Sequence, residues 1–241
     1  MQIIAVSPHL DDAALSVGAS LAALARGGHD VTVLTCFTRS VPDPTGFALA
    51  CQTDKGLGPD VDYLALRRAE DSAALAVLGV GQRHLDLPEA PHRGYTSAPD
   101  LFAGVHDGDD AWRDVLTGLA GSRADLWLAP QALGSHADHL QVLRAVVAHG
   151  HPTAFWRDRP YALREPDAVA GVDLPASLAE VELELDDTHR ARRAEACACY
   201  TTQLGLQFGG EQAMRDALAG LAEPLAADET ALVALVELGA R

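Results

Sequence analysis

The sequence predicts an α/β fold built on a mostly parallel β-sheet, and three observations point to it. Short apolar runs such as Ile3–Val6 suit strands that are covered on both faces. Stretches with helical spacing of apolar residues follow these runs along the chain. With 241 residues the chain can bury a large core without a disulfide or metal staple. We expect a single domain over residues 1–241, with the C-terminal third packed on the same sheet.

The expected strands and helices alternate along the chain. Short apolar or alternating runs predict strands at residues 3–6, 31–37, 83–87, 125–130, 153–156 and 179–185. Helical spacing predicts helices at residues 13–26, 62–78, 109–119, 140–148, 188–200, 211–221 and 228–238. Residues 38–60 and 89–108 are irregular segments that are too long to be mere connections. Such segments often form the walls of a site.

Composition limits the partners and the compartment. The formal net charge of −16 disfavours nucleic acid or an anionic membrane surface as the main partner, because like charges repel each other. The four cysteines show neither Cys-x-x-Cys nor zinc-finger spacing, which fits a reducing compartment. We see no signal peptide before the first strand and no apolar run of the ~18 residues that span a membrane. We therefore expect a cytoplasmic protein that acts on a small molecule.

Two polar turns carry residue types that bind metal ions. The turn Ser7–Asp12 follows the first strand, and the turn Gly134–His139 follows the strand at residues 125–130. Each turn also leads into a predicted helix. Because the carboxyl ends of parallel strands meet at one edge of a sheet, we expect the two turns to converge there.

The spacing within these turns favours a catalytic metal site. His9 and Asp12 are three residues apart and can share a face, whereas Asp11 lies about 100° around the helix axis from Asp12. His9, Asp12 and His139 together form a His, Asp, His set. Such a set leaves one coordination position open, which is typical of catalytic zinc. Zinc lowers the pKa of its water to about 7, and a free carboxylate can take the proton from that water.

Each turn taken alone also has a purely structural explanation. Asp11 and Asp12 would stabilise the positive end of a helix in any protein. Ser135 and Asp138 have the spacing of a capping box, although Asp is a weaker partner than Glu in this motif. A single loop histidine is more often a hydrogen-bonded residue than a ligand. The presence of two such turns at one sheet edge favours the metal site.

These motifs resemble the PIG-L/LmbE-like zinc N-deacetylases. The signature of that family, Pro-His-x-Asp-Asp-Glu followed later by His-x-Asp-His, corresponds here to Pro8–Ala13 and His136–His139. Supporting similarities lie at residues 67–70, 78–80, 158–161 and 200–203. The resemblance implies a Rossmann-like, LmbE-like three-layer fold for the whole domain. Ala13 stands where the family usually has Glu, a change that concerns the support beneath the metal rather than its ligands.

The resemblance also implies roles for individual residues. It implies that one zinc ion per chain, or another divalent ion, is held by His9, Asp12 and His139. Asp11 corresponds to the general base. His136 matches the histidine that stabilises the oxyanion or protonates the departing amine. Asp138 would orient His136 and favour its charged form.

The expected activity is therefore hydrolysis of an N-acyl group. The family removes N-acetyl groups from N-acetylglucosamine-type amino sugars or related glycosides and metabolites, through a zinc-bound water that an aspartate activates. Alternatives are an amidase that acts on thiol conjugates and a catalytically inactive small-molecule-binding relative. A nucleotide-binding module is disfavoured because the first turn has no Gly-x-Gly-x-x-Gly motif. Weaker candidates for substrate contact are Arg67, Arg93 and Tyr95, and the C-terminal helices fit either an internal core or a homo-oligomer interface.

Overall fold

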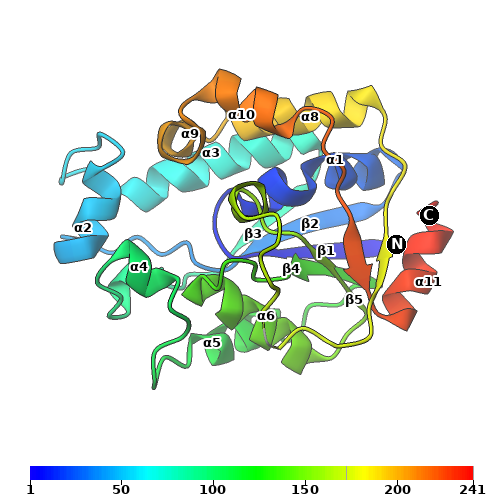
Figure 1. Ribbon diagram of the computed structural model, residues 1–241, viewed down its shortest axis with the longest axis horizontal. Helices are drawn as coiled ribbons and strands as arrows, with labels where there is room; N and C mark the ends of the chain where they lie inside the picture. The colour runs from blue at the N-terminus through cyan, green and yellow to red at the C-terminus, as the bar shows by residue number, and fades with distance from the viewer. Residues whose placement is uncertain (172, 241) are drawn as a thin grey trace.

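The core of the structure is a seven-stranded sheet. The computed structural model describes residues 1–171 and 173–240 (Figure 1). Its strands are β1 (Gln2–Ser7), β2 (Asp30–Thr35), β3 (Gly81–His84), β4 (Leu126–Pro130), β5 (Thr153–Trp156), β6 (Ala179–Val181) and β7 (Leu225–Ala227). Their order across the sheet is β3-β2-β1-β4-β5-β7-β6. The first five are parallel, whereas β7 runs antiparallel to both β5 and β6.

Helices cover both faces of this sheet. The α-helices are α1 (Asp12–Arg26), α2 (Gly46–Thr53), α3 (Tyr63–Leu78), α4 (Ala98–Leu101), α5 (Ala111–Leu119), α6 (Ala137–His149), α7 (Tyr161–Arg164), α8 (Asp187–Ala198), α9 (Thr201–Phe208), α10 (Glu211–Leu218) and α11 (Glu229–Glu237). Helices α1, α3 and α8 pack together on one face, and α5 and α6 pack on the other (Figure 1). The prediction of an α/β fold with a mostly parallel sheet is confirmed.

The strand sequences explain why both faces are covered. Along β1, Ile3 and Ala5 belong to the apolar core beneath α1 and α3, whereas Val6 belongs to the core beneath α5 and α6. Successive side chains of a strand point to opposite faces, so a run of apolar residues needs cover on both. In β4 all five residues are buried, including Trp127.

The strand order places a crevice at the carboxyl ends of β1 and β4. From β1 the chain adds β2 and β3 on one side, and then crosses over to add β4 and β5 on the other side. The winding direction thus reverses between β1 and β4, and such a switch point is where open α/β sheets bind ligands. Both polar turns identified in the sequence leave the sheet at this point.

The remaining differences from the predictions concern short elements. Residues 38–60, expected to be irregular, contain α2, and residues 89–108 contain a 3-10 turn (Ala90–His92) and α4. Helix α9, with eight residues, and strand β7, with three, were not predicted. Elements this short show too little periodicity of apolar residues to be recognised. The expected strand at 83–87 begins earlier, at Gly81, where the backbone pairs with β2. The expected strand at 179–185 ends at Val181.

Two further observations bear on the compartment and on crosslinks. None of the helices in the described part of the chain is long and apolar enough to cross a membrane. The four cysteines are all free thiols: Cys36, Cys51, Cys197 and Cys199.

The C-terminal third adds β6 and β7 to the sheet, and α11 contacts β5, β6 and β7.

Candidate active site and metal centre

The turn after β1 is shaped by its own hydrogen bonds. The Ser7 hydroxyl donates to the His9 carbonyl (2.7 Å) and accepts from the Ala13 backbone N–H (3.1 Å). The His9 backbone N–H donates to Asp12 Oδ2 (2.8 Å), which holds both side chains over the end of the sheet. The alanine at position 13 is buried in the core beneath α1.

Three donor atoms from the two turns converge. Asp12 Oδ2 lies 3.2 Å from His9 Nδ1 and 3.3 Å from His139 Nε2. Zinc bonds of about 2.0–2.2 Å at tetrahedral angles would separate ligand atoms by roughly 3.3–3.6 Å. His139 Nε2 is buried and makes no hydrogen bond of good geometry among the described residues, although it faces the Asp12 carboxylate as an ion pair. A cation between the three donor atoms would satisfy this nitrogen and the Asp12 carboxylate together, so the donor set fits a metal ion.

A second grouping shares His9 with the first but fits a metal less well. His9, His136 and Asp138 also lie close enough together to bind an ion. The Asp138 carboxylate, however, already accepts from the Ala90 backbone N–H (3.0 Å) and pairs with Arg93 (2.7 Å). Among the described residues, Asp12 forms ion pairs only with His9 and His139, so no arginine or lysine competes with a metal for its carboxylate.

Asp138 supports a different histidine from the one expected. Its Oδ2 lies 2.9 Å from His9 Nε2, so its carboxylate orients His9 rather than His136. The contact with His136 comes from the Asp138 backbone, whose N–H donates to His136 Nδ1 (3.2 Å). Although burial disfavours its charged form, Arg93 and His9 hold the pKa of Asp138 well below its usual range. The predicted orienting role toward His136 is therefore corrected.

Burial of His136 disfavours the charged form of its imidazole in the metal-free structure, although the nearby Asp138 favours that form. Burial lowers the pKa of its imidazole well below the usual range, and the positive charge of His9 lowers it further. Because His136 Nδ1 accepts a hydrogen bond, the neutral imidazole carries its proton on Nε2. His136 thus presents one N–H donor at the wall of the cavity.

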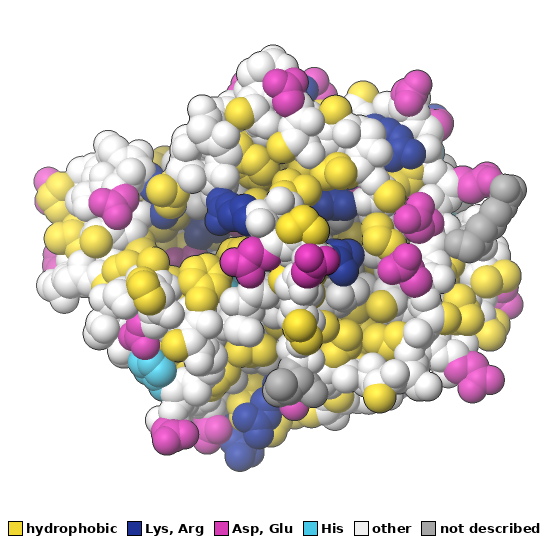
Figure 2. All heavy atoms as spheres, in the orientation of Figure 1, with side chains coloured by type: hydrophobic (Ala, Val, Ile, Leu, Met, Phe, Trp, Pro, Cys, Tyr) yellow, Lys and Arg dark blue, Asp and Glu magenta, His cyan; other side chains and the backbone are white. Residues whose placement is uncertain are grey.

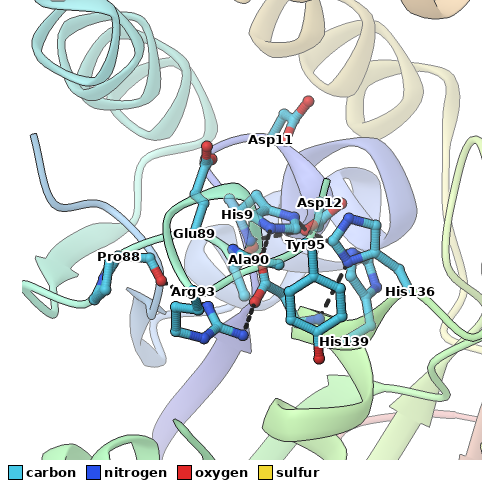
Figure 3. A network of polar contacts seen from close by, with 12 residues as sticks. His9, Asp11, Asp12, Pro88, Glu89, Ala90, Arg93, Tyr95, His136 and His139 are labelled. Atoms are coloured by element: carbon cyan, nitrogen blue, oxygen red, sulfur yellow. Dashed lines mark hydrogen bonds and ion pairs between the residues drawn. The ribbon is translucent and has the colours of Figure 1, made fainter. Parts of the chain in front are cut away.

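Asp11 faces away from the three donor atoms, as its spacing predicts (Figure 3). Its Oδ1 accepts from Arg67 (3.1 Å) and its Oδ2 accepts from Gln207 (3.0 Å). Burial raises the pKa of the Asp11 carboxyl against the opposing charge of Arg67, and the neighbouring Asp12 raises it further. A raised pKa makes a carboxylate a better proton acceptor near neutral pH.

The two candidate histidine ligands are each held by a carboxylate. His139 Nδ1 lies 2.5 Å from Asp158 Oδ1, and both side chains are fully buried. Burial alone would lower the pKa of His139, but Asp12 and Asp158 raise it to about 9. In the same way Asp12 and Asp138 raise the pKa of His9 to about 10 against the effect of burial. Both rings are therefore oriented with their free nitrogens toward Asp12.

The three weaker candidates for substrate contact are placed differently by the structure. Arg67 lines the cavity, where it bridges Asp11 and Glu89 (2.6 Å). Arg93 and Tyr95 are not among the described residues that line it. Both bind Asp109 behind the site, and the Tyr95 hydroxyl points away from the histidines (Figure 3). Their expected contact with substrate is corrected to a supporting role.

A cavity of about 620 Å³ opens above these groups. We call the lining residues His9, Asp11, Asp12 and His136, together with the fully buried His139, the cavity floor, and the lining residues Phe47, Lys55, Phe102, Arg164 and Leu206 the cavity rim. Figure 2 shows hydrophobic side chains gathered around the hollow, with basic groups at its edge. Lys55 Nζ donates to the Cys51 carbonyl (2.6 Å) and lies over the Tyr63 ring.

Asp158, Gln207 and Glu89 were not identified as site residues from the sequence. Asp158 follows β5, which lies next to β4 in the sheet. Because the carboxyl ends of parallel strands meet at one edge of the sheet, Asp158 could have been predicted to lie near the two turns. Gln207 lies on α9, which was not predicted at all. Glu89 lies in an irregular segment that carries no periodic signal.

An α/β fold with a His, Asp, His set at its switch point, and beside it an aspartate that is not part of that set, defines a class of candidate metal-dependent hydrolases. A comparison with protein-family models matches residues 4–149 to the PIG-L family, described as GlcNAc-PI de-N-acetylase. The match covers more than half of the chain, and the chain belongs to this family.

Named relatives and solved structures agree with this assignment. A 2'-N-acetylparomamine deacetylase of Streptomyces fradiae is 36% identical over 167 residues, which make up 65% of this chain and 56% of the relative. The chain thus spans little more than half of that protein. A zinc-inhibited teicoplanin deacetylase has a TM-score of 0.78 and 27% identity, over 95% of this chain and 99% of its own. The pseudoaglycone deacetylase Dbv21 has a TM-score of 0.76 and 34% identity, over 93% and 96% of the two chains.

Proposed function

We propose that this protein is a zinc-dependent N-deacetylase that acts on an N-acetylated amino sugar, either free or as part of a larger glycosylated metabolite. The observation that carries the proposal is the convergence of His9, Asp12 and His139 beside an unligated Asp11 at the bottom of an open cavity. The named relatives support the reaction type, because each is a deacetylase.

The metal would be held by His9, Asp12 and His139. When bound, zinc would supply a Lewis acid that polarises the acyl carbonyl and makes water more acidic. Asp138 and Asp158 would keep the two histidine rings in place through the nitrogens that do not face the metal.

The residues of the cavity floor would carry the protons. Asp11 would accept a proton from the water as its oxygen bonds to the acyl carbon. His136 would donate a hydrogen bond from Nε2 to the oxygen of the tetrahedral intermediate. Protonated Asp11 would then give its proton to the nitrogen as the C–N bond breaks, which yields acetate and a free amine. Each contribution of this kind is worth about 10²- to 10⁴-fold in rate.

The first experiment measures metal content and amine release together. Purified wild-type protein and the variant His139→Ala are analysed for zinc, and each is incubated with a panel of N-acetylated amino sugars. We expect about one zinc per chain in the wild type, its loss in the variant, and release of acetate and free amine only by the wild type.

A matched control separates this site from adventitious binding. His151→Ala removes an exposed histidine outside the cavity and should keep both zinc and activity. A wild type that neither contains zinc nor binds added zinc would refute the proposal and favour a non-catalytic binding protein. If the wild type binds zinc but cleaves no acetylated amino sugar, the proposed zinc site is kept and the proposed substrate class is refuted.

A further inference from the structure

Helix α1, which begins with the proposed ligand Asp12, is broken in its middle. Val17 has non-helical backbone angles (φ −136°, ψ 22°). The Glu223 carboxylate accepts hydrogen bonds from the backbone N–H groups of Ala19 (3.0 Å) and Ser20 (2.7 Å). These are N–H groups that a helix starting after the break would leave without partners. Glu223 therefore caps the second segment of α1 from outside the helix.

The C-terminal third of the chain builds this break. Glu223 is 2% exposed and is paired with Arg193 of α8 at 2.8 Å. Arg193 in turn packs on Gly18, where an added Cβ would lie only 3.0 Å from the Arg193 Cγ atom. The glycine at position 18 thus lets α8 approach α1 closely at the break.

The break also frees groups of Ser16 that bind Arg159. The Ser16 carbonyl accepts from Arg159 Nη1 (2.9 Å), and the Ser16 hydroxyl accepts from the Arg159 backbone N–H (3.0 Å). Arg159 Nη2 donates to the Ala222 carbonyl beside Glu223. The residue before Arg159 is Asp158, which holds His139. One arginine therefore joins the α1 segment that carries Asp12 to the segment that orients His139.

We propose that Arg159 is a positioning residue that fixes the separation between Asp12 and His139, and so sets the affinity of the site for zinc. The inference rests on the proposed function, because it takes these two residues as ligands. Arg159 is buried and is not among the described residues that line the cavity, so it acts through Ser16 and Asp158 rather than on substrate. It also lies beyond residues 4–149, which match the family model.

The test compares Arg159→Met with Arg190→Met. Arg190 donates to the carbonyls of Leu185 (3.2 Å) and Leu221 (3.3 Å) in the same region, and neither acceptor lies on α1, so its variant removes similar bonds. Zinc affinity is measured by competition with a chromogenic chelator, and ligand geometry by the visible absorption of the cobalt-substituted protein. We expect Arg159→Met to bind zinc about 10- to 100-fold more weakly with an altered cobalt spectrum, and Arg190→Met to match the wild type.

The outcomes separate this inference from the proposed function. If Arg159→Met only lowers the Tm while zinc affinity and the cobalt spectrum stay as in the wild type, Arg159 is merely structural and the inference is overturned. If that variant does not fold, Arg159→Lys decides, because it keeps the positive charge but has a single nitrogen in place of the two that bind the Ser16 and Ala222 carbonyls. We expect it to bind zinc several-fold more weakly, and unchanged binding would overturn the inference. A wild type that binds no zinc refutes the proposed function itself.

Discussion

The floor and the rim of the cavity are built in opposite ways. The ionisable groups of the floor are buried, apart from the half-buried His9, and most are tied to side chains from other elements, as His139 is to Asp158 and His9 is to Asp138. The rim comes from short helices and is open, with Phe102 38% and Leu206 61% exposed. The floor holds a fixed geometry for one reaction, whereas the rim can change without disturbing it. Substrate identity should therefore depend on the rim.

The largest effect should come from Asp11, the proposed general base, which is not among the proposed metal ligands. Asp11→Asn keeps the shape of the side chain but removes the proton acceptor, so we expect kcat to fall by about 10²- to 10⁴-fold with zinc still bound. Turnover and zinc content are measured on the same preparation. Loss of zinc together with activity would make Asp11 a ligand and remove the distinction between base and ligands.

The second effect concerns the support beneath the floor. Asp158→Asn replaces the carboxylate beside His139 Nδ1 with a neutral amide, which weakens the orientation and basicity of the ring. We expect zinc affinity to fall about 10- to 100-fold, as measured by chelator competition. Unchanged affinity would show that packing alone holds His139. Arg144→Gln, which changes a residue outside the site, serves as the control.

A third prediction uses pH to compare the floor with and without metal. The pKa values of His9 (about 10) and His139 (about 9) are raised in the folded, zinc-free protein above an unfolded value of about 6.5. These charged pairs make their full contribution to the free energy of unfolding below pH 6.5. That contribution is lost as pH rises through 9 to 10. Urea unfolding of chelator-treated protein should therefore show stability falling from pH 7 to pH 10.

The zinc-loaded protein provides the contrast for this measurement. Zinc bound as proposed would replace the ring protons on His9 and His139, so its binding should release protons and strengthen as pH rises. A zinc-free protein that becomes more stable between pH 7 and pH 10 would contradict the assignment of charged histidines in the floor.

The smallest effect should come from the rim. Leu206→Ala shortens an exposed side chain of the rim that is not a proposed metal ligand, so we expect KM to rise by less than about tenfold. Zinc content and kcat should stay as in the wild type. Steady-state kinetics on the substrate found in the first screen provide the measurement. A fall in kcat equal to the fall in kcat/KM would show that Leu206 acts on the floor.

The same contrast explains what could be predicted from the sequence. The floor was accessible because apolar strands and polar turns give strong local signals, and parallel strands bring such turns together at one edge. The two turns at Ser7–Asp12 and Gly134–His139 do meet as expected. The direction of the Asp138 carboxylate could not be predicted, because it also pairs with Arg93, which lies 45 residues earlier in the chain.

The rim could not be predicted for a physical reason. Helices α2 and α9 have eight residues each, and an eight-residue helix depends on tertiary contacts more than on its own propensity. The start of α9 is fixed by Glu70 of α3, which accepts from the Thr201 hydroxyl and from the backbone and hydroxyl of Thr202. Thr201 and Glu70 are 131 residues apart in the chain, so their contact cannot be recognised from the local spacing of apolar residues.

Lys55 at the rim has a practical consequence, because it is the sole lysine of the chain. Amine-selective acylating reagents would find only the N-terminus and Lys55. Burial lowers the pKa of Lys55, and nearby Arg67 lowers it further, so more of its amine is unprotonated and reactive at a given pH. A dye or a surface linkage attached through lysine would therefore sit at the mouth of the cavity. The rate of such labelling would report whether the cavity is occupied.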